Sequence, residues 1–374
     1  MDPAVQPAPD RRDVPGARLV VTGTLAPADV ARVFALVDAA TVADGVRPLS
    51  EHVTLHVRYG GEGPDRNLLL VVPDDGAQPD DGTPAAGAGS PPPVVRPGER
   101  LVGYAHLDPT DVVAGAAVEI VVHPGSRGAG HGRRLVEAAA AATPDGRLRL
   151  WAHGDNSSAR ALAASLGFRE VRRLEQMRRS LWSPLPEARI PDGVTVRAFR
   201  PGTDDAEWLA LNAKAFAHHP EQGGWTAADL GARMREAWFD PGGFLVAFDD
   251  TTGAMVAFHW TKIHGGDGHD RGPAATGRAA ADGADPQPHA HPHAHDPIGE
   301  VYVVGVDPAA QGRGLGRAMT LAGLQWLRAR GLPQAMLYVE ADNAPALAVY
   351  RSLGFTHWDT DVMFSRPTGA APDR

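Results

Sequence analysis

The chain has 374 residues, of which 43% are hydrophobic and 22% are charged, and its formal net charge is −9. This length and apolar content suit two folded domains, and the acidic balance argues against a nucleic-acid partner, which needs a concentrated basic face. Cysteine is absent, which excludes disulfides, thiolate metal sites and a cysteine nucleophile.

The sequence shows no membrane-spanning segment and no secretory signal. No apolar run approaches the roughly 18 residues that span a bilayer. The N-terminus has neither the basic region nor the apolar stretch of a secretory signal. We therefore expect a cytoplasmic protein with no membrane partner and no nucleic-acid partner.

Taken in chain order, the sequence divides into two parts of similar length. Pro-rich and Gly-rich stretches interrupt each part, and we expect flexible insertions at 73–99 and 265–297. The predicted order is a disordered N-terminal tail (1–16), a first domain (17–182), a linker (183–192), a second domain (193–366) and a C-terminal tail (367–374).

The second insertion contains an alternating run of histidines, at positions 289, 291, 293 and 295. Imidazole nitrogens bind divalent metals. However, alternation in a tract of Pro and Ala offers no preorganised tetrahedral site, and no cysteine can complete one. We expect a solvent-exposed loop and no metal cofactor.

One sequence pattern occurs twice at matched spacing. An apolar, strand-like run ends at Pro124 in the first copy and at Pro308 in the second, and a loop with a Gly-x-Gly sequence follows and leads into a helix. About 30 residues later each copy has an Asp-Asn pair, at Asn156 and Asn343, and then a Leu-Gly-Phe turn. The chain is therefore a tandem duplication.

The loop between strand and helix has a physical use. Gly314 and Gly316 let the backbone approach a ligand closely, and the following helix adds the positive end of its dipole, so that a pyrophosphate binds with little help from side chains. Arg313 and Arg317 add positive charge. A dinucleotide-binding fingerprint is disfavoured because Met319 stands where its third glycine belongs, and the Gly-Lys-Ser/Thr of a P-loop is absent.

The second half of the pattern, from Asn343 to Phe355, completes a recognisable pair of motifs. Together they resemble the acyl-CoA-dependent N-acetyltransferases of the GNAT superfamily. The resemblance implies acetyl-CoA as the donor. It also implies a mixed α/β (α+β) fold with two tandem GNAT domains, each a central, mostly antiparallel sheet that is flanked by helices and splays where the cofactor enters.

The two copies differ in their acid–base candidates. Glu300 aligns with Ala116, and Tyr350 aligns with Ala163. Acetyl transfer to an amine requires removal of a proton from the attacking ammonium and is helped by protonation of the leaving thiolate. We infer that the second domain is catalytic and the first inactive. Two simpler interpretations stay open, namely that Glu300 is a strand-edge charge and Tyr350 a core aromatic.

Several strings outside this motif are more specific. They are His219–Trp225, Phe258–His264, Gly299–Gln311 and Leu337–Asn343, with Trp151–Gly154 and Gln176–Arg179 in the first half. They resemble the mycothiol synthase family, over nearly the whole chain apart from the tails and insertions. That resemblance implies that the acceptor is the cysteinyl amine of a pseudo-disaccharide, cysteinyl-glucosaminyl-inositol. Because the duplication can supply contacts that other members obtain by dimerising, we expect a monomer.

The resemblance also implies site residues. In the second domain, acetyl-CoA contacts would be Val304, Gly305, Val306, Gln311, Gly312, Arg313, Gly314, Leu315, Gly316 and Arg317, with Asn343, Ala344, Pro345, Ala346, Leu347 and Ala348 flanking the pantetheine arm. In the first domain they would be Ile120, Val121, Val122, Gly128, Ala129, Gly130, His131, Gly132 and Arg133. Substrate contacts would be Glu51, Glu221, Lys262, Glu300 and Tyr338, although Tyr338 is also open to a packing role.

The mechanism implied is direct attack of the amine on the thioester. Glu300 would act as general base and Tyr350 as general acid, and backbone N–H groups around Val304–Val306 would polarise the thioester carbonyl. Two departures from the family pattern stand out: the insertion 265–297 separates Lys262 from Glu300, and Gly128 and Ala129 replace basic residues that are frequent in the first-domain loop.

Two alternative functions stay open from the sequence. One is a tandem acetyltransferase for another small amine, such as an aminoglycoside, or for a protein N-terminus. A protein substrate favours an open groove, whereas the polar set Glu51, Glu221, Lys262 and Glu300 predicts a closed pocket. The other is an acyl-CoA-binding regulatory protein without catalysis, against which Glu300 and Tyr350 argue.

Overall fold

The computed structural model describes residues 16–60, 63–74, 91–111, 115–143, 145–264 and 297–366. Outside the described residues lie the predicted tails apart from Gly16, most of the two predicted insertions and the alternating histidines. The side chains of Pro220 and Glu221 also lie outside them. Among the described helices, none has both the length and the apolar character needed to cross a membrane.

The chain forms two compact units. The N-terminal unit comprises Met1–Leu174 and Asp359–Arg374, and the C-terminal unit comprises Glu175–Trp358. The boundary between the two units therefore falls within two strands, β6 (Arg169–Ser180) and β12 (Thr356–Ser365). Most of β12, which ends the second repeat, belongs to the N-terminal unit, and the second half of β6 belongs to the C-terminal unit.

The N-terminal unit contains a mostly antiparallel sheet, in the order β1-β2-β3-β4-β5-β12. Strands β4 and β5 are its parallel neighbours, and β12 pairs with β5 through Val362–Ser365. Besides β6 and β12, its elements are β1 (Arg18–Thr22), α1 (Pro27–Asp44), α2 (Glu51–Tyr59), β2 (Arg66–Pro73), β3 (Glu99–Asp108), β4 (Ala116–Val122), α3 (His131–Ala141), β5 (Leu148–Ala152) and α4 (Ser157–Ser165).

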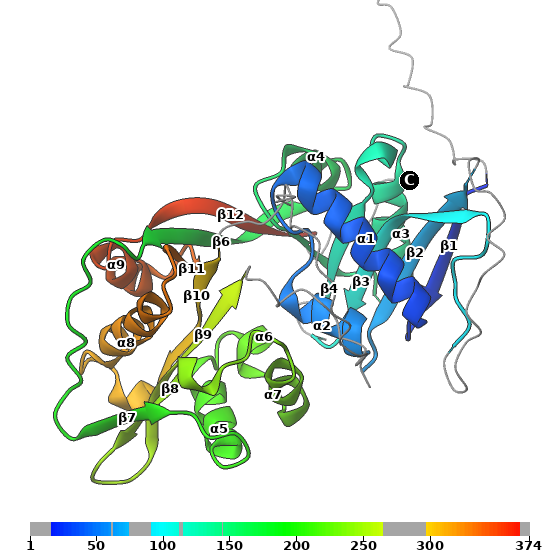
Figure 1. Ribbon diagram of the computed structural model, residues 1–374. Helices are drawn as coiled ribbons and strands as arrows, with labels where there is room; N and C mark the ends of the chain where they lie inside the picture. The colour runs from blue at the N-terminus through cyan, green and yellow to red at the C-terminus, as the bar shows by residue number, and fades with distance from the viewer. Residues whose placement is uncertain are drawn as a thin grey trace, which may run out of the picture. The chain divides into compact units, whose positions relative to one another are not determined.

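Helices cover both faces of this sheet (Figure 1). The side chains of β2 alternate between the faces, as the period of a strand requires. Leu69 and Val71 pack with α1 and α2, whereas Leu68 and Leu70 pack with α3 and α4 on the other side. These four side chains are all fully buried. Because both faces of the strand are covered, the sequence of β2 is a continuous apolar run.

The C-terminal unit repeats this plan, with the sheet order β6-β11-β10-β9-β8-β7. Strands β7 to β10 form an antiparallel series, and β10 and β11 are parallel. Its further elements are β7 (Val194–Ala198), α5 (Asp205–Ala215), α6 (Pro220–Gly223), α7 (Ala227–Met234), β8 (Phe244–Asp249), β9 (Met255–His264), β10 (Ile298–Val306), α8 (Leu315–Ala329), β11 (Gln334–Glu340) and α9 (Ala344–Ser352).

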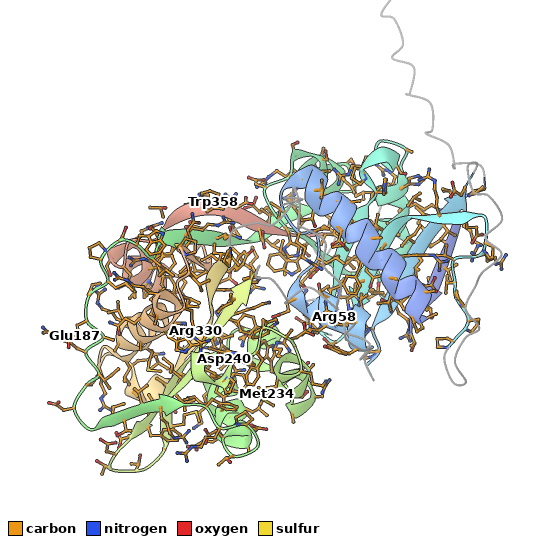
Figure 2. The ribbon with its side chains drawn as sticks, viewed as in Figure 1. Arg58, Glu187, Met234, Asp240, Arg330 and Trp358 are labelled. Carbon is orange, nitrogen blue, oxygen red and sulfur yellow. The ribbon has the colours of Figure 1, made fainter. Side chains whose placement is uncertain are left out.

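The core of the C-terminal unit has an aromatic side and an aliphatic side. Trp208 of α5 packs edge-on against Trp260 of β9, and Trp260 stacks on Phe244 of β8 at 4.3 Å between ring centroids. On the opposite face, α8 buries a stripe of leucines against β10 and β11. An ion pair of 2.8 Å joins Arg330, after α8, to Asp240, in the turn before β8 (Figure 2).

The predicted fold class is confirmed. Each unit is mixed α/β, with a mostly antiparallel sheet and one parallel step, β4 to β5 or β10 to β11. Each parallel step is bridged by the glycine loop and the helix after it, α3 or α8. The duplication seen in the sequence is thus a duplication of structure.

Candidate active site

The sheet of the C-terminal unit opens at the place where the motif begins. Strands β10 and β11 pair only from Ile298–Glu300 to Gln334–Met336, although β10 continues to Val306 and β11 to Glu340. On its other edge β10 stays paired with β9 as far as Val306. Because successive N–H groups of a strand point to alternate edges, part of the backbone of 301–306 faces the opening.

The loop after β10 has a backbone that glycine favours. Gly312 and Gly314 have φ angles of 80° and 79°, in the left-handed region, and Gly314 is the N-cap of α8. In the other repeat, Gly128 and Gly130 have φ angles of 78° and 86°. Residues other than glycine are sterically disfavoured in this left-handed region. The glycines therefore give both copies the same loop of N–H groups at a helix N-terminus.

The two helices that border each opening are tied together in the same way. In the C-terminal unit, Arg317 of α8 donates to the hydroxyl of Ser352 at the end of α9, at 2.6 Å. In the N-terminal unit, Arg133 of α3 donates to Ser165 of α4, at 3.0 Å. The predicted motif residue Asn343 caps α9, its side chain accepting from the N–H of Ala346, as Asn156 caps α4.

Gly305 has a packing reason of its own. A Cβ atom on this residue would lie 2.4 Å from Cε1 of Phe258, a fully buried aromatic of β9. Any side chain would therefore push β10 off β9. The absence of a side chain at Gly305 therefore lets β10 pack against β9 beside the opening. This holds whatever contact the backbone of 304–306 makes with a ligand.

The predicted base Glu300 lies on β10 at the last residue before the opening. Its side chain is buried, with 7% of its surface exposed, and Lys262 stands directly opposite it on β9. A carboxylate oxygen, Oε2, lies 2.6 Å from Nε2 of His264. The contact with His264 was not anticipated, although strand alternation from Lys262 to His264 puts both residues on one face.

The predicted substrate contact Lys262 rests on an aromatic wall. Its Nζ lies 4.7 Å from the ring centroid of Trp238 and 5.4 Å from that of Tyr302. The hydroxyl of Tyr302 accepts from Nε of Arg233 at 2.8 Å, and the Arg233 guanidinium lies 3.6 Å from the ring centroid of Trp225. These cation–π contacts hold two positive charges in defined positions.

The predicted acid Tyr350 is on α9, and its ring meets Phe355 edge-on at 6.0 Å between centroids. Burial raises the pKa of Tyr350 to about 12, so the phenol keeps its proton at neutral and mildly alkaline pH. Tyr338, on β11, is 41% exposed, and its hydroxyl accepts from Nε2 of Gln176 at 2.6 Å. This exposure argues against a packing role for Tyr338.

The other two predicted substrate contacts lie elsewhere in the chain. Glu221 belongs to the short helix α6, and its side chain lies outside the described residues. Glu51 belongs to the N-terminal unit, in the first turn of α2. The structure thus brings Glu300, Lys262 and His264 together, with Tyr338 and Tyr350 on neighbouring elements of the same unit.

The N-terminal unit has a large cavity at its own opening. It has a volume of about 1010 Å³ and is lined by the end of β4, the glycine loop, the start of α3, the end of β5 and the helix α4. The lining includes all nine predicted cofactor contacts of the first domain, from Ile120–Val122 and Gly128–Arg133. It also includes Ala163, the counterpart of Tyr350. The cavity is at the upper end of the usual range for ligand sites, about 300–1,000 Å³.

A buried ionic group at this cavity was not predicted from the sequence. Nδ1 of His153 lies 2.8 Å from Oδ2 of Asp361, a residue of β12, and Nε2 lies 3.5 Å from Oε2 of Glu119 on β4. Burial opposes the charged form, but the hydrogen bond with Asp361 and the ion pair with Glu119 raise the pKa of His153 to about 10. Glu119 also accepts the N–H of Ser50, the N-cap of α2, at 2.6 Å.

Family models match both repeats. A model described as the acetyltransferase (GNAT) family matches residues 214–355, and a model described as an acetyltransferase (GNAT) domain matches residues 94–170. Among curated proteins, the chain is 53% identical to mycothiol acetyltransferase of Acidothermus cellulolyticus, over 93% of this chain and 94% of that protein. It is 46% identical to mycothiol acetyltransferase of Streptosporangium roseum, over 94% and 99%.

Solved structures with the same tandem arrangement are more distant in sequence. A GCN5-related N-acetyltransferase from Sphaerobacter thermophilus is similar with a TM-score of 0.58 and 23% identity, over 96% of this chain and 97% of that chain. A tandem GNAT protein from the clavulanic acid biosynthesis pathway gives a TM-score of 0.59 and 19% identity, over 95% and 100%. At these identities the likeness concerns the fold.

Proposed function

The chain belongs to the mycothiol acetyltransferase family of GNAT proteins, and from this premise we propose a specific reaction for it. It is an acetyl-CoA-dependent N-acetyltransferase. The proposed acceptor is the cysteinyl amine of 1-O-(2-(L-cysteinylamido)-2-deoxy-alpha-D-glucopyranosyl)-D-myo-inositol, and the product is mycothiol. The observation that carries this proposal is similarity over nearly the whole length to relatives that bear that name.

In this proposal the C-terminal unit does the chemistry. Acetyl-CoA would lie in the opening between β10 and β11, with its pyrophosphate on the N–H groups of 311–317 at the start of α8. The arm would run between that opening and α9. Backbone N–H groups of 304–306 that face the opening would donate to the thioester oxygen, where negative charge develops during attack.

Glu300 is proposed to remove the proton from the acceptor ammonium, directly or through one water. Its position supports this role, because it is buried at the point where β10 and β11 separate. His264 would orient the carboxylate through the 2.6 Å contact. The amine nitrogen then forms a bond to the carbonyl carbon, and the carbon–sulfur bond of the thioester breaks.

Tyr350 is proposed to protonate the departing CoA thiolate. Because burial raises its pKa to about 12, it keeps a proton to donate throughout the pH range in which amines are nucleophilic. Polar groups suit the rest of the acceptor, which carries many hydroxyls and an ammonium. We propose Glu51, Glu221, Lys262 and Tyr338 for these contacts.

The N-terminal unit is proposed to bind acetyl-CoA without turning it over. Its glycine loop and its cavity of about 1010 Å³ support binding. Ala116 and Ala163 stand where the proposed base and acid stand in the other repeat, so both of these groups are missing there. We further propose, as the sequence indicates, that the protein works as a monomer in the cytoplasm.

The test is product formation from acetyl-CoA with the full acceptor, run beside free cysteine, glucosamine and an aminoglycoside. Mass detection of the N-acetyl product avoids interference from the acceptor thiol. We expect turnover with the full acceptor alone. Turnover with the aminoglycoside instead would overturn the acceptor, and binding of acetyl-CoA without turnover of any amine would favour a binding protein.

A further inference from the structure

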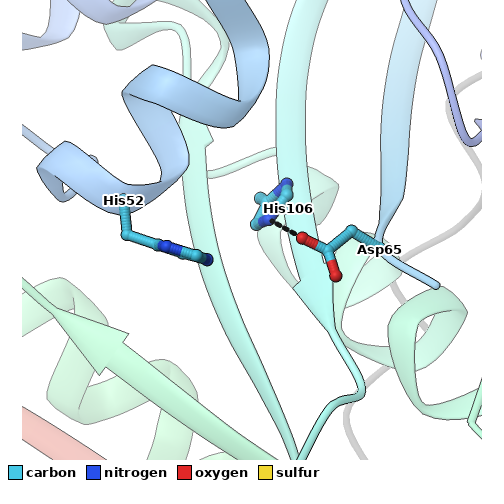
Figure 3. Close-up of side chains that lie close together, drawn as sticks. All are labelled: His52, Asp65 and His106. Carbon is cyan, nitrogen blue, oxygen red and sulfur yellow. Dashed lines mark ion pairs between the residues drawn. The ribbon is translucent and has the colours of Figure 1, made fainter. Parts of the chain in front are cut away.

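Three histidines and an aspartate form a cluster in the N-terminal unit, away from the glycine loop. His52 and His56 lie one turn apart on α2, Asp65 precedes β2, and His106 lies on β3. One ligand atom from each of His52, Asp65 and His106 lies within 4.8 Å of the others. Figure 3 shows the His52 ring directed toward His106 and Asp65. The catalytic proposal uses none of these four residues.

The cluster leaves polar atoms without partners. His106 is 1% exposed. Its Nδ1 has no hydrogen-bond partner within the described part of the chain, and its Nε2 faces only the carboxylate of Asp65, at 3.3 Å. Nε2 of His56 also has no hydrogen-bond partner among the described residues. A buried polar group without a partner destabilises a fold, and a bound ion is one explanation for such buried imidazoles.

The separation of two of these ligand atoms is compatible with a bound metal ion. Nε2 of His106 and Oδ2 of Asp65 lie 3.3 Å apart, close to the separation of about 3.3 Å between two ligands of a tetrahedral zinc with bonds near 2.0 Å. The neighbouring groups support the ligands. Nδ1 of His56 lies 3.1 Å from the same oxygen of Asp65, and Asp108 lies 3.8 Å from Nε2 of His52. Such outer contacts commonly orient metal ligands.

We propose that His52, Asp65 and His106 bind one divalent transition-metal ion of the zinc type, with water as the fourth ligand and His56 holding Asp65. Two imidazoles and one carboxylate select zinc, nickel or copper over magnesium and calcium, which prefer oxygen ligands. Because α2, the segment before β2 and β3 each supply one ligand, the ion would fasten α2 to the sheet. Glu51 immediately precedes His52, so the ion would also fix the backbone of that residue.

Imidazoles of the alternating histidines would add weak, unspecific metal binding to the titration, so the test uses a background without them. We would replace His289, His291, His293 and His295 by Asn in an untagged full-length protein, strip it with chelator, and titrate zinc against a chromophoric chelator. We expect one tight equivalent of zinc and a rise in Tm on binding. Cobalt in place of zinc should give the visible absorption of a low-symmetry, nitrogen- and oxygen-ligated site.

Two further variants in this background decide the outcome. His52→Asn should weaken zinc binding by about 10-fold or more, and it should fold normally because half of the His52 side chain is exposed. His218→Asn, an exposed histidine of the other unit, should change nothing. Absence of a tight equivalent in the background protein would overturn the proposal, and so would equal zinc affinity of the His52→Asn and His218→Asn variants.

Discussion

The two repeats share a backbone but not a set of reactive side chains. Both sheets open after one short parallel pairing, both loops place two glycines at positive φ, and both helix pairs are joined by an Arg–Ser hydrogen bond. The proposed base and acid are present in one and replaced by alanine in the other. The proposed cofactor-binding geometry is therefore a property of the backbone, while the proposed catalysis depends on a few side chains that the fold does not require.

The repeats also differ in where they hold buried charge. The N-terminal unit has the group His153, Glu119 and Asp361 beside its cavity. In the C-terminal repeat Glu340 occupies the position of His153, and Val303 that of Glu119. The C-terminal unit instead buries Glu300 beside His264, at the edge of its opening. One repeat thus uses a buried ionic group within its structure, and the other has one where proton transfer is proposed.

The largest expected effect comes from the proposed base. Glu300→Gln keeps the size of the side chain but removes the proton acceptor, and we expect kcat to fall by about 10²–10⁴-fold, with the affinity for acetyl-CoA unchanged. Glu187→Gln, in the exposed segment between β6 and β7, is the matched control. Steady-state rates and calorimetric binding separate the two quantities. Retention of more than a third of wild-type kcat would remove Glu300 from the mechanism.

The second prediction concerns stability of the N-terminal unit in alkali. The folded-state pKa of His153 is raised from 6.5 to about 10, so its stabilising charge is fully present below about pH 6.5 and is lost as pH rises through about 10. We expect a loss of about 3 kcal/mol over this window. Pulse proteolysis in urea, with a β5 peptide quantified by mass, follows this unit alone.

The His153→Gln variant tests the cause of that pH dependence. It should be less stable than wild type at pH 7, because two buried carboxylates lose their cation, and the dependence on alkaline pH should largely disappear. A similar alkaline loss in His153→Gln would mean that other groups cause it. His218→Asn serves as the control, since that side chain is exposed in the other unit.

The proposed acid should have a smaller effect. Tyr350→Phe keeps the ring contact with Phe355 but removes the proton, and we expect kcat to fall by about 10–100-fold. Because the pKa of Tyr350 is about 12, wild-type kcat should not decline between about pH 8 and pH 10. A decline in that range in wild type, absent from Tyr350→Phe, would mean that the phenol ionises earlier.

Much of this arrangement could be predicted from the sequence because it follows local rules. The glycines of the loop, the Asn cap and the Leu-Gly-Phe turn are each read within a few residues, and their repetition predicts two similar units. The opposition of Lys262 and Glu300 was not predicted; it follows from the antiparallel pairing of β9 with β10. The roles of Glu300 and Tyr350 stay predictions.

Features that depend on distant parts of the chain were not predicted. Asp361 reaches His153 only because β12 pairs with β5 in the N-terminal unit, and no local pattern reveals that a strand from the second repeat completes the sheet of the first. The histidine cluster had a partial signal, since His52 and His56 are four residues apart on one helix face. Asp65 and His106 join them only through the packing of α2 on β2 and β3.

The smallest expected effects come from substituting a matched pair of glycines, one in each repeat. Comparing the two variants distinguishes the functions of the two loops most directly. Gly130 and Gly314 have φ angles of 86° and 79°, and a Cβ atom on either would meet no atom within 4 Å. Alanine at either position should therefore cost the same backbone strain, about 1 kcal/mol. Any difference between the two variants must come from what each loop binds.

Gly314→Ala should raise KM for acetyl-CoA by about tenfold, since a methyl group would stand where the pyrophosphate meets the backbone and 1.4 kcal/mol is a factor of ten. Gly130→Ala should leave kcat and KM unchanged and weaken a second equivalent of bound acetyl-CoA in calorimetry. Equal effects on KM would mean that both loops serve turnover. If the wild-type protein binds one equivalent and Gly130→Ala changes nothing, the N-terminal cavity does not hold acetyl-CoA, and shared backbone geometry is then insufficient for binding as well as for catalysis.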